Sequence, residues 1–326
     1  MVITNEKLIQ IKRKPITDMF FQNISKDITG ILKKIPSSAL GCIEEIRLKT
    51  NKPLMIYDGS TGWFVTEKGK LTQEDTTGYI VTQEAINKTI ELISNSSVYA
   101  IQEELKNGFV TIEGGHRVGV TGKVVVSNGN IISIKDIAGM NIRISKQIIG
   151  AADSVMKYIV AGTHKVANTL IISPPQCGKT TMLRDIARQL SYGDANTERT
   201  GIKVGIVDER SEIAACFKGV AQNDVGPRTD VLDACPKALG MIMMIRSMSP
   251  EVLITDEIGT NQDISALKQV LNAGVKVIAS IHGYSREDAI RRPIFKSMLH
   301  ERFFEKIIVL GKSKGTGTVE QVWDEN

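Results

Sequence analysis

The spacing of hydrophobic residues changes near Gly150, and this change divides the chain into two parts. Before Gly150, apolar residues recur at helical spacing near residues 17–36 and again at residues 83–94, which predicts two amphipathic helices. Three strand segments accompany them, namely one through Leu48, one at residues 54–57, and a strand-rich piece at residues 108–144 broken by Gly114-Gly115 and Asn128-Gly129-Asn130. The pattern therefore predicts an α+β domain over residues 1–148.

After Gly150 the pattern becomes an alternation of helices and apolar strands, beginning with a helix at residues 151–161. Five segments are short, β-branched and almost continuously hydrophobic, as strands of a parallel sheet covered on both faces are; they are residues 168–172, 203–207, 252–255, 275–281 and 306–310. Helix start signals lie between them, namely Pro236 at a first helical position, Asp263 as an N-cap, and Ser285 followed by Asp288. Residues 149–326 are therefore predicted to form a larger α/β domain whose ligands bind at the carboxyl ends of its strands.

The composition is that of a folded protein with two domains. The chain has 326 residues, of which 42% are hydrophobic and 24% are charged, as is typical of globular domains. No stretch approaches the roughly 20 apolar residues that span a bilayer, and residues 1–15 lack the apolar core of a signal peptide. The four cysteines form no Cys-x-x-Cys pair, so we expect reduced thiols in a cytoplasm rather than zinc ligands or disulfides.

A phosphate-binding loop is predicted directly after the strand at residues 168–172. Its nine residues are Ser173, Pro174, Pro175, Gln176, Cys177, Gly178, Lys179, Thr180 and Thr181, and a helix at residues 182–190 follows. Triphosphate binding requires amide N–H groups at a helix N-terminus, a lysine that reaches the β- and γ-phosphates, and a hydroxyl that holds Mg²⁺. Lys179 and Thr180 occupy those two places, which predicts a site for ATP and Mg²⁺.

This loop departs from the usual pattern in its first half. Ser173 stands where the first glycine is usual, and Gln176 occupies a place often held by another glycine. The two prolines have no backbone N–H, so the amide donors must come from Cys177 onward. A chance Gly-Lys-Thr sequence at the start of a helix is the structural alternative.

Two carboxylates follow the strand at residues 252–255, in the arrangement of a Walker B motif. Asp256 is predicted to order the Mg²⁺ shell, and Glu257 is predicted to act as the general base toward the attacking water. Two other strands also end in polar residues. Glu209, in the charged segment 208–212, could reach the metal-bound water or the γ-phosphate, and His282 could form a hydrogen bond to the γ-phosphate. The alternatives are a solvated loop for Glu209 and a structural histidine for His282.

Together these residues resemble the secretion and pilus motor ATPases, which are RecA-like P-loop motors. Residues 208–212 resemble that family's Asp box, His282 resembles its His box, and Arg246 followed by Pro250 resembles the segment before its Walker B strand. A nearly full-length resemblance is to the stage III sporulation AA family, and it is carried by residues 207–212, 228–233, 246–250 and 256–259. The resemblance implies a RecA-like P-loop ATPase domain behind a smaller α+β domain.

The same resemblance implies partners and a location. It implies a homo-oligomer, a hexameric ring, on the cytoplasmic, mother-cell side of a membrane-embedded sporulation channel complex between mother cell and forespore. The protein would be peripheral to the membrane and held there by these channel proteins. It also implies that Arg117 and Arg143 face nucleotide in the same subunit or the next, as arginine fingers do. Ordinary salt bridges are the alternative for both, and equally for Arg210, Arg228 and Arg246.

We therefore expect Mg-dependent ATP hydrolysis that energises transport or assembly of the channel complex. One rival is a nucleic-acid-binding RecA-like ATPase, since the net charge of +5 allows an anionic partner. An aromatic content of 5% without basic–aromatic interleaving counts against single-strand stacking surfaces. The second rival is a scaffold that binds nucleotide without hydrolysis; Ser173 and Gln176 favour it, and the intact acid pair opposes it. Four methionines are predicted to fill the core, namely Met241, Met243, Met244 and Met248.

Overall fold

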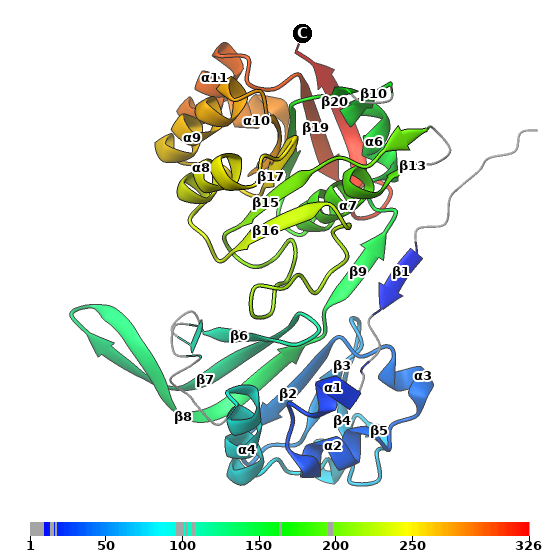
Figure 1. Cartoon of the computed structure of the whole chain (residues 1–326). Coiled ribbons are helices and arrows are strands. Elements are labelled where there is room, and N and C mark those ends of the chain that lie inside the picture. Colours follow the sequence, from blue (N-terminus) through cyan, green and yellow to red (C-terminus); the bar gives the residue numbers. More distant parts are fainter. Residues whose placement is uncertain are drawn as a thin grey trace, which may run out of the picture. The chain divides into compact units, whose positions relative to one another are not determined.

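The structure is a computed structural model that describes residues 10–13, 16, 18–95, 101, 104–105, 108–162, 165–194 and 198–325. The chain divides into two compact units (Figure 1). The first unit is Arg13–Lys146, and the second is Gln147–Asn326 together with residues 10–12. Each unit has its own sheet and its own hydrophobic core.

An antiparallel sheet of seven strands forms the first unit, in the order β5-β4-β3-β2-β8-β7-β6. The strands are β2 (Glu45–Lys49), β3 (Met55–Tyr57), β4 (Gly62–Val65), β5 (Leu71–Thr72), β6 (Phe109–Ile112), β7 (His116–Ser127) and β8 (Asn130–Arg143). Side chains alternate along β2, where Ile46 and Leu48 are fully buried. The predicted α+β organisation is confirmed, including the strands through Leu48 and at Met55–Tyr57.

The helices of this unit differ from the prediction at its amino-terminal end. They are α1 (Asp18–Phe21), α2 (Lys26–Leu32), α3 (Ser37–Leu40), the 3-10 turn η1 (Asp75–Thr77) and α4 (Gln83–Ile93). The single helix predicted near residues 17–36 is wrong. Ser25 is extended and its N–H donates to the Thr89 hydroxyl of α4, which separates α1 from α2. The helical spacing of apolar residues survives the break, because Phe20, Ile24 and Ile28 are all buried in the core.

Strands β7 and β8 continue beyond the sheet as a long hairpin. Its tip is a turn in which Asn128 (φ 50°) and Gly129 (φ 76°) are left-handed, as a two-residue hairpin turn requires. The predicted break at this position is confirmed. The tip exposes four large apolar side chains, namely Val124, Val126, Ile131 and Ile132.

The second unit contains a seven-stranded sheet in the order β16-β15-β17-β18-β12-β19-β20. The strands are β12 (Thr169–Ser173), β15 (Val204–Asp208), β16 (Thr229–Asp233), β17 (Val252–Thr255), β18 (Lys276–His282), β19 (Lys306–Gly311) and β20 (Thr318–Asp324). All neighbours are parallel except β19 and β20. The predicted parallel sheet is confirmed at all five strands, and β16 and β20 extend it at the two edges.

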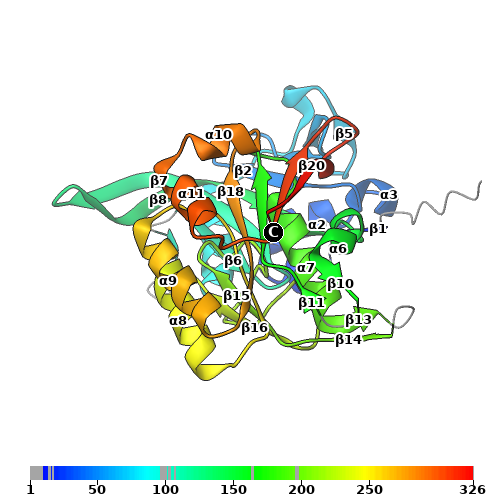
Figure 2. The same ribbon diagram turned by 90° about the horizontal axis from the view of Figure 1, so that it is seen from above.

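Helices cover both faces of this sheet (Figures 1 and 2). They are α6 (Asp153–Ile159), α7 (Lys179–Tyr192), α8 (Lys237–Ser247), α9 (Asn261–Asn272), α10 (Arg286–Ile290) and α11 (Pro293–His300). One core joins α6 and α7 to alternate strand residues such as Ile171. The other core joins α8, α9 and α11 to residues such as Leu170, which points to the opposite face. None of the described helices is long and apolar enough to cross a membrane.

Three details of these helices correct the sequence prediction. Thr260 is the N-cap of α9, and Asp263 is the third residue of a capping box rather than the cap itself. Pro236 is the N-cap of α8, one residue before the helix. Met243 and Met248 are exposed, whereas Met241 and Met244 are buried, so only half of the methionine cluster fills the core.

Three short strand pairs complete the structure. They are β1 (Gln10–Arg13) with β9 (Lys146–Ile149), β10 (Val160–Ala161) with β11 (Lys165–Val166), and β13 (Gly193–Asp194) with β14 (Arg199–Thr200). Ser285 caps α10 as predicted, because its hydroxyl accepts a hydrogen bond from the Asp288 N–H.

Candidate active site

The carboxyl ends of four parallel strands bring the predicted site residues to one edge of the second sheet. The phosphate loop follows β12, and the acid pair follows β17. Strand β18 lies between these two strands and ends at His282. Strand β15 lies on the other side of β17 and ends at Asp208. Because parallel strands end at the same edge, this arrangement places the polar residues together.

The phosphate loop makes its turn without the usual first glycine. Ser173 is fully buried, and its hydroxyl donates to the Pro174 carbonyl at 3.0 Å. Gln176 (φ 60°) and Gly178 (φ 82°) take left-handed conformations, so the reversal occurs later in the loop. Helix α7 begins at Lys179, and its free N-terminal N–H groups and dipole favour an anion there. Cys177 is buried, while Pro175 and Gln176 are exposed.

Lys179 and Thr180 contact the acid pair directly. The Lys179 ammonium lies 2.9 Å from Glu257 Oε1 and 3.1 Å from Asp256 Oδ1, and only 6% of the lysine side chain is exposed. The Thr180 hydroxyl donates to Asp256 Oδ2 at 2.9 Å. A hydroxyl and a carboxylate in contact fit Mg²⁺, which prefers oxygen ligands and usually takes one or two from the protein. Thr180 and Asp256 are therefore suited to hold the ion.

Ser280 of β18 connects the two acidic residues, and sequence reasoning missed it. Its hydroxyl donates to Asp256 Oδ1 and accepts the Glu257 N–H at 3.0 Å. Its carbonyl accepts the Ile258 N–H at 2.9 Å. Glu257 is left-handed (φ 51°), which is a strained conformation for a glutamate and has to be held by its surroundings. A hydroxyl within the apolar segment 275–281 was the signal available in the sequence.

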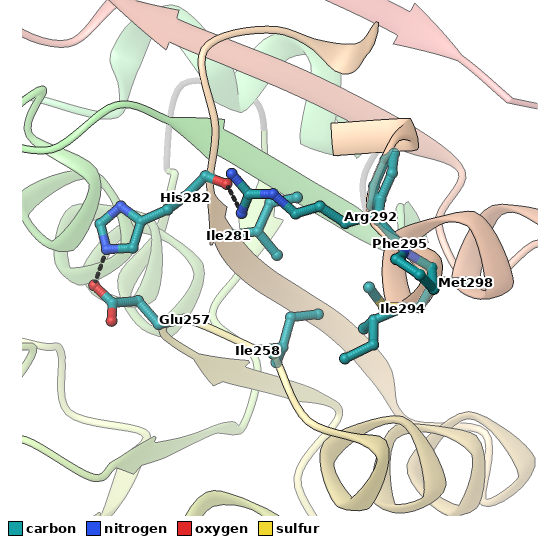
Figure 3. Close-up of a pocket in the computed structure, with 10 residues that line it drawn as sticks. Glu257, Ile258, Ile281, His282, Arg292, Ile294, Phe295 and Met298 are labelled. Atoms are coloured by element: carbon teal, nitrogen blue, oxygen red, sulfur yellow. Dashed lines mark hydrogen bonds and ion pairs between the residues drawn. The ribbon is translucent and has the colours of Figure 1, made fainter. Parts of the chain in front are cut away.

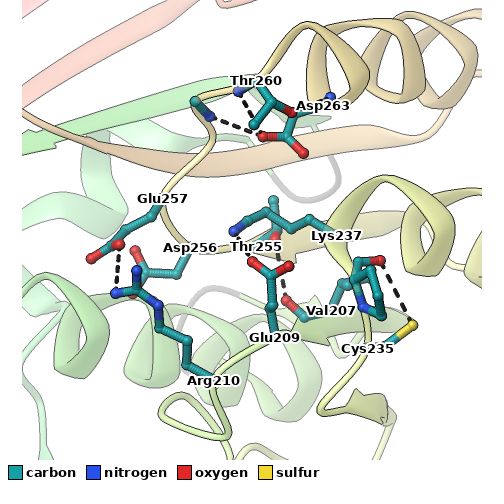
Figure 4. Close-up of polar contacts among 12 residues, drawn as sticks. Val207, Glu209, Arg210, Cys235, Lys237, Thr255, Asp256, Glu257, Thr260 and Asp263 are labelled. Carbon is teal, nitrogen blue, oxygen red and sulfur yellow. Dashed lines mark hydrogen bonds and ion pairs between the residues drawn. The ribbon is translucent and has the colours of Figure 1, made fainter. Parts of the chain in front are cut away.

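Two cationic side chains and a histidine surround the Glu257 carboxylate. Besides Lys179, Arg210 Nη1 lies 2.8 Å from Oε2 and His282 Nε2 lies 2.7 Å from Oε1 (Figures 3 and 4). Partial burial raises the pKa of Glu257, but the hydrogen bond and charge of Lys179, with the charges of His282 and Arg210, outweigh burial and hold the pKa below its usual value. Glu257 is therefore ionised at neutral pH and able to accept a proton.

The residues of the charged segment after β15 make different contacts. Asp208 is buried, and its two oxygens accept the Glu212 and Ala214 N–H groups at 2.9 Å each. Burial raises the pKa of Asp208 to about 6, against the effect of these hydrogen bonds. Glu209 pairs with Lys237 at 2.5 Å, so within this segment Arg210 rather than Glu209 contacts Glu257 (Figure 4).

A buried arginine joins this segment to the phosphate-loop helix. Arg184 of α7 donates to the Ile213 carbonyl at 2.5 Å and to the Glu212 carbonyl at 2.6 Å. Burial lowers the pKa of Arg184 to about 10, with nearby Asp208, Asp185 and Glu212 acting in the opposite direction, so the guanidinium stays charged at neutral pH. No local pattern predicts this contact, because an arginine within a helix is ordinarily exposed.

An apolar cavity of about 280 Å³ borders Glu257 and His282 (Figure 3). Its apolar walls are Ile258, Ile281, Ile294, Phe295 and Met298. Arg292 lies at the same cavity and donates to the His282 carbonyl at 2.7 Å, which fixes the backbone after β18. Glu257 thus has charged groups on one side and apolar walls on the other.

The two predicted arginine fingers lie in the first unit. Arg117 of β7 and Arg143 of β8 are direct cross-strand neighbours. The Arg117 guanidinium stacks on the Phe109 ring at 4.2 Å, and Arg143 Nε lies 3.3 Å from Glu45 Oε1. Each arginine therefore has a partner within its own unit.

The strand order and the loop positions give the second unit a RecA-like α/β fold. Two solved structures share the fold of the chain. ATPase DotB of Yersinia pseudotuberculosis aligns with a TM-score of 0.56 and 14% identity, over 93% of this chain and 81% of that one. The pilus retraction motor PilT with bound ADP aligns with a TM-score of 0.56 and 14% identity, over 87% and 80%. At these identities the likeness establishes the fold.

Sequence similarity identifies a narrower family. The chain belongs to the family described as "Sporulation stage III, protein AA", whose model matches residues 12–326. Stage III sporulation protein AA of Bacillus subtilis (strain 168) is 45% identical over 303 residues, which cover 93% of this chain and 94% of that protein. Both resemblances inferred from the motifs are confirmed.

Proposed function

We propose that this protein binds ATP with Mg²⁺ and hydrolyses it to ADP and phosphate. The observation that carries the proposal is the contact of Thr180 with Asp256 and of Lys179 with Glu257, residues 76 and 78 positions apart in the sequence. A phosphate-loop lysine and hydroxyl in contact with an acid pair are the parts that phosphoryl transfer to water requires.

In the proposed reaction, different residues bind the phosphates, hold Mg²⁺ and accept the proton. The Lys179 ammonium and the N-terminal N–H groups of α7 bind phosphate oxygens, which replace the acid pair as partners of the lysine. Thr180 and Asp256 hold Mg²⁺, which supplies positive charge against the phosphates when bound. Glu257, ionised and fixed by Ser280, accepts the proton of the attacking water. Arg210 and His282 orient its carboxylate.

We propose further that hydrolysis energises transport or assembly of a sporulation membrane channel complex between mother cell and forespore. Membership in the sporulation family and the fold shared with DotB and PilT support this role. The protein would work as a hexameric ring on the cytoplasmic, mother-cell side, peripheral to the membrane and bound to channel proteins. Its mass in solution, with and without MgATP, tests the ring; a monomer under both conditions contradicts it.

Glu257→Gln tests the hydrolytic assignment. The variant should bind MgATP with wild-type affinity by calorimetry, because Lys179, Thr180 and Asp256 remain. Phosphate release should slow by about 10² to 10⁴, since the general base is lost. Glu91→Gln, an exposed residue of α4 in the first unit, is the matched control and should hydrolyse normally. If Glu257→Gln hydrolyses ATP at the wild-type rate, another residue is the base and this assignment fails.

A further inference from the structure

The loop between β19 and β20 lies at the same sheet edge as the phosphate loop. Strand β19 pairs with β12 in parallel, from Thr169 opposite Lys306 to Ile172 opposite Val309. Strand β18 pairs with β12 on its other side. The phosphate loop is therefore flanked by the acid pair and His282 on one side and by residues 312–317 on the other. Figure 1 shows β19 and β20 beside α7.

The loop approaches the phosphate loop closely. A methyl group placed on Gly178 would lie 3.2 Å from Thr316 Cγ2 and 3.8 Å from the Gly317 nitrogen. A methyl group placed on Gly317 would lie 3.8 Å from Met182 Cε, in the first turn of α7. Residues 316 and 317 thus pack over the start of the helix that receives the phosphates.

Hydrogen bonds fix the shape of this loop. Glu320 of β20 accepts the Ser313 N–H at 3.0 Å and the Ser313 hydroxyl at 2.9 Å. The Thr318 hydroxyl donates to the Gly315 carbonyl at 2.6 Å. Gly315 (φ 115°) and Gly317 (φ 85°) take conformations that side chains disfavour. The shape of the loop is therefore set by its own hydrogen bonds and by those to β20.

The loop is also basic. Lys312 and Lys314 are exposed. Lys314 interacts electrostatically with the Glu320 carboxylate, and no hydrogen bond or salt bridge of either ammonium group is found among the described residues. The remaining members of the loop are glycines and hydroxyl residues. Two lysines on an ordered glycine-rich loop beside a phosphate-binding helix are suited to an anionic ligand.

We infer that residues 312–317 form the second wall of the nucleotide site and contact the α-phosphate and ribose of a nucleoside di- or triphosphate. The inference rests on the proposed function, because it takes the γ-phosphate to face Glu257. The phosphates then cross the N-terminus of α7, and the nucleoside half extends to the opposite side, where this loop lies. Lys312 and Lys314 supply the charge, and Thr316 lies nearest the phosphate loop. The loop has no aromatic residue on which a base could stack, so it contacts the phosphate and the sugar rather than the base.

Lysine substitutions test the charge contacts. Lys312→Gln/Lys314→Gln should weaken MgADP and MgGDP binding by calorimetry by the same factor, about threefold to thirtyfold, as expected for two partly exposed charge pairs. Lys312→Arg/Lys314→Arg should restore most of the affinity. Lys68→Gln/Lys70→Gln removes the same charge from an exposed turn of the first unit and should bind normally.

Cysteine labelling tests proximity. In Thr316→Cys, MgADP should slow alkylation of residue 316 by N-ethylmaleimide at least fivefold, as read by peptide mass mapping, and should not do so when Lys179→Ala is added. If the wild type binds MgADP but Lys312→Gln/Lys314→Gln binds equally well and residue 316 is not protected, this inference is overturned while the proposed function stands. If the wild type binds no MgADP, the proposed function itself fails.

Discussion

Replacement of Ser280 by alanine tests whether this serine only stabilises the fold or also positions Glu257 for catalysis. Ser280 is fully buried and its hydroxyl makes two hydrogen bonds, one to the Asp256 carboxylate and one from the Glu257 N–H. Ser280→Ala removes both bonds and leaves a buried N–H without its acceptor. The free energy of unfolding should fall by about 1–3 kcal/mol, the usual result of orphaning a buried polar group.

The effect on turnover should be larger than the effect on binding. Glu257 has a left-handed backbone conformation, which costs of order 1–3 kcal/mol. Without the hydrogen bond to Ser280, the backbone of Glu257 should relax from this conformation. A general base displaced by 1 Å loses about 10² in rate, so kcat should fall roughly 10- to 100-fold. The KM for ATP should change less than about threefold, because Lys179, Thr180 and the α7 amides are untouched.

Steady-state phosphate release and urea unfolding measure these quantities, with two variants as controls. Ser280→Thr keeps the hydroxyl and should recover most of kcat, although its extra methyl group costs about 1–3 kcal/mol in a packed strand. Ser191→Ala removes another fully buried hydroxyl, which accepts the Arg228 N–H at 2.7 Å, and should lower stability without lowering kcat. If Ser280→Ala turns over at the wild-type rate while losing as much stability as Ser191→Ala, the serine does not position Glu257.

Two further predictions concern the Asp208 carboxyl and the first-unit arginines. The folded pKa of Asp208, about 6, lies above its ordinary 3.8, so the stability from the protonated form is complete below pH 4 and is lost as the pH rises through 6. Urea unfolding at pH 3 to 7 should show the wild type losing about 3 kcal/mol relative to Asp208→Asn; a constant difference would contradict the pKa. Arg117→Ala/Arg143→Ala mixed with Lys179→Ala should regain hydrolysis if the arginines act across subunits; no recovery despite proven co-assembly excludes donation in trans.

The parallel sheet and the acid pair could be predicted because local sequence determines them. Continuous apolar strands such as Val252–Thr255 are buried on both faces, and each strand end then has a known position. In the structure, Lys179 and Thr180 contact Asp256 and Glu257, and the roles predicted for these residues stay predictions. The periodicity of residues 17–36 also identified the buried face correctly.

Features that depend on tertiary contacts were missed or misplaced. The break between α1 and α2 depends on Thr89, which is 64 residues from Ser25 in the sequence. The N-cap of α9 was predicted at Asp263 but is Thr260. A capping box contains two residues that can cap a helix, and the sequence alone does not show which of them is the N-cap. The position of residues 312–317 beside Gly178 follows from the β19–β12 pairing, and no local pattern reveals that pairing.

The contacts of Arg184 connect the helix after the phosphate loop to the segment that contacts Glu257, the proposed general base. Helix α7 begins at Lys179, and one and a half turns later Arg184 binds the carbonyls of Glu212 and Ile213. The Asp208 carboxylate accepts the N–H groups of Glu212 and Ala214 in the same segment. These hydrogen bonds restrain the backbone on both sides of Arg210. Arg210 in turn pairs with Glu257, the residue that we propose as the general base. The helix that begins at the phosphate loop is therefore connected, through Arg184 and the segment after β15, to the arginine that pairs with Glu257.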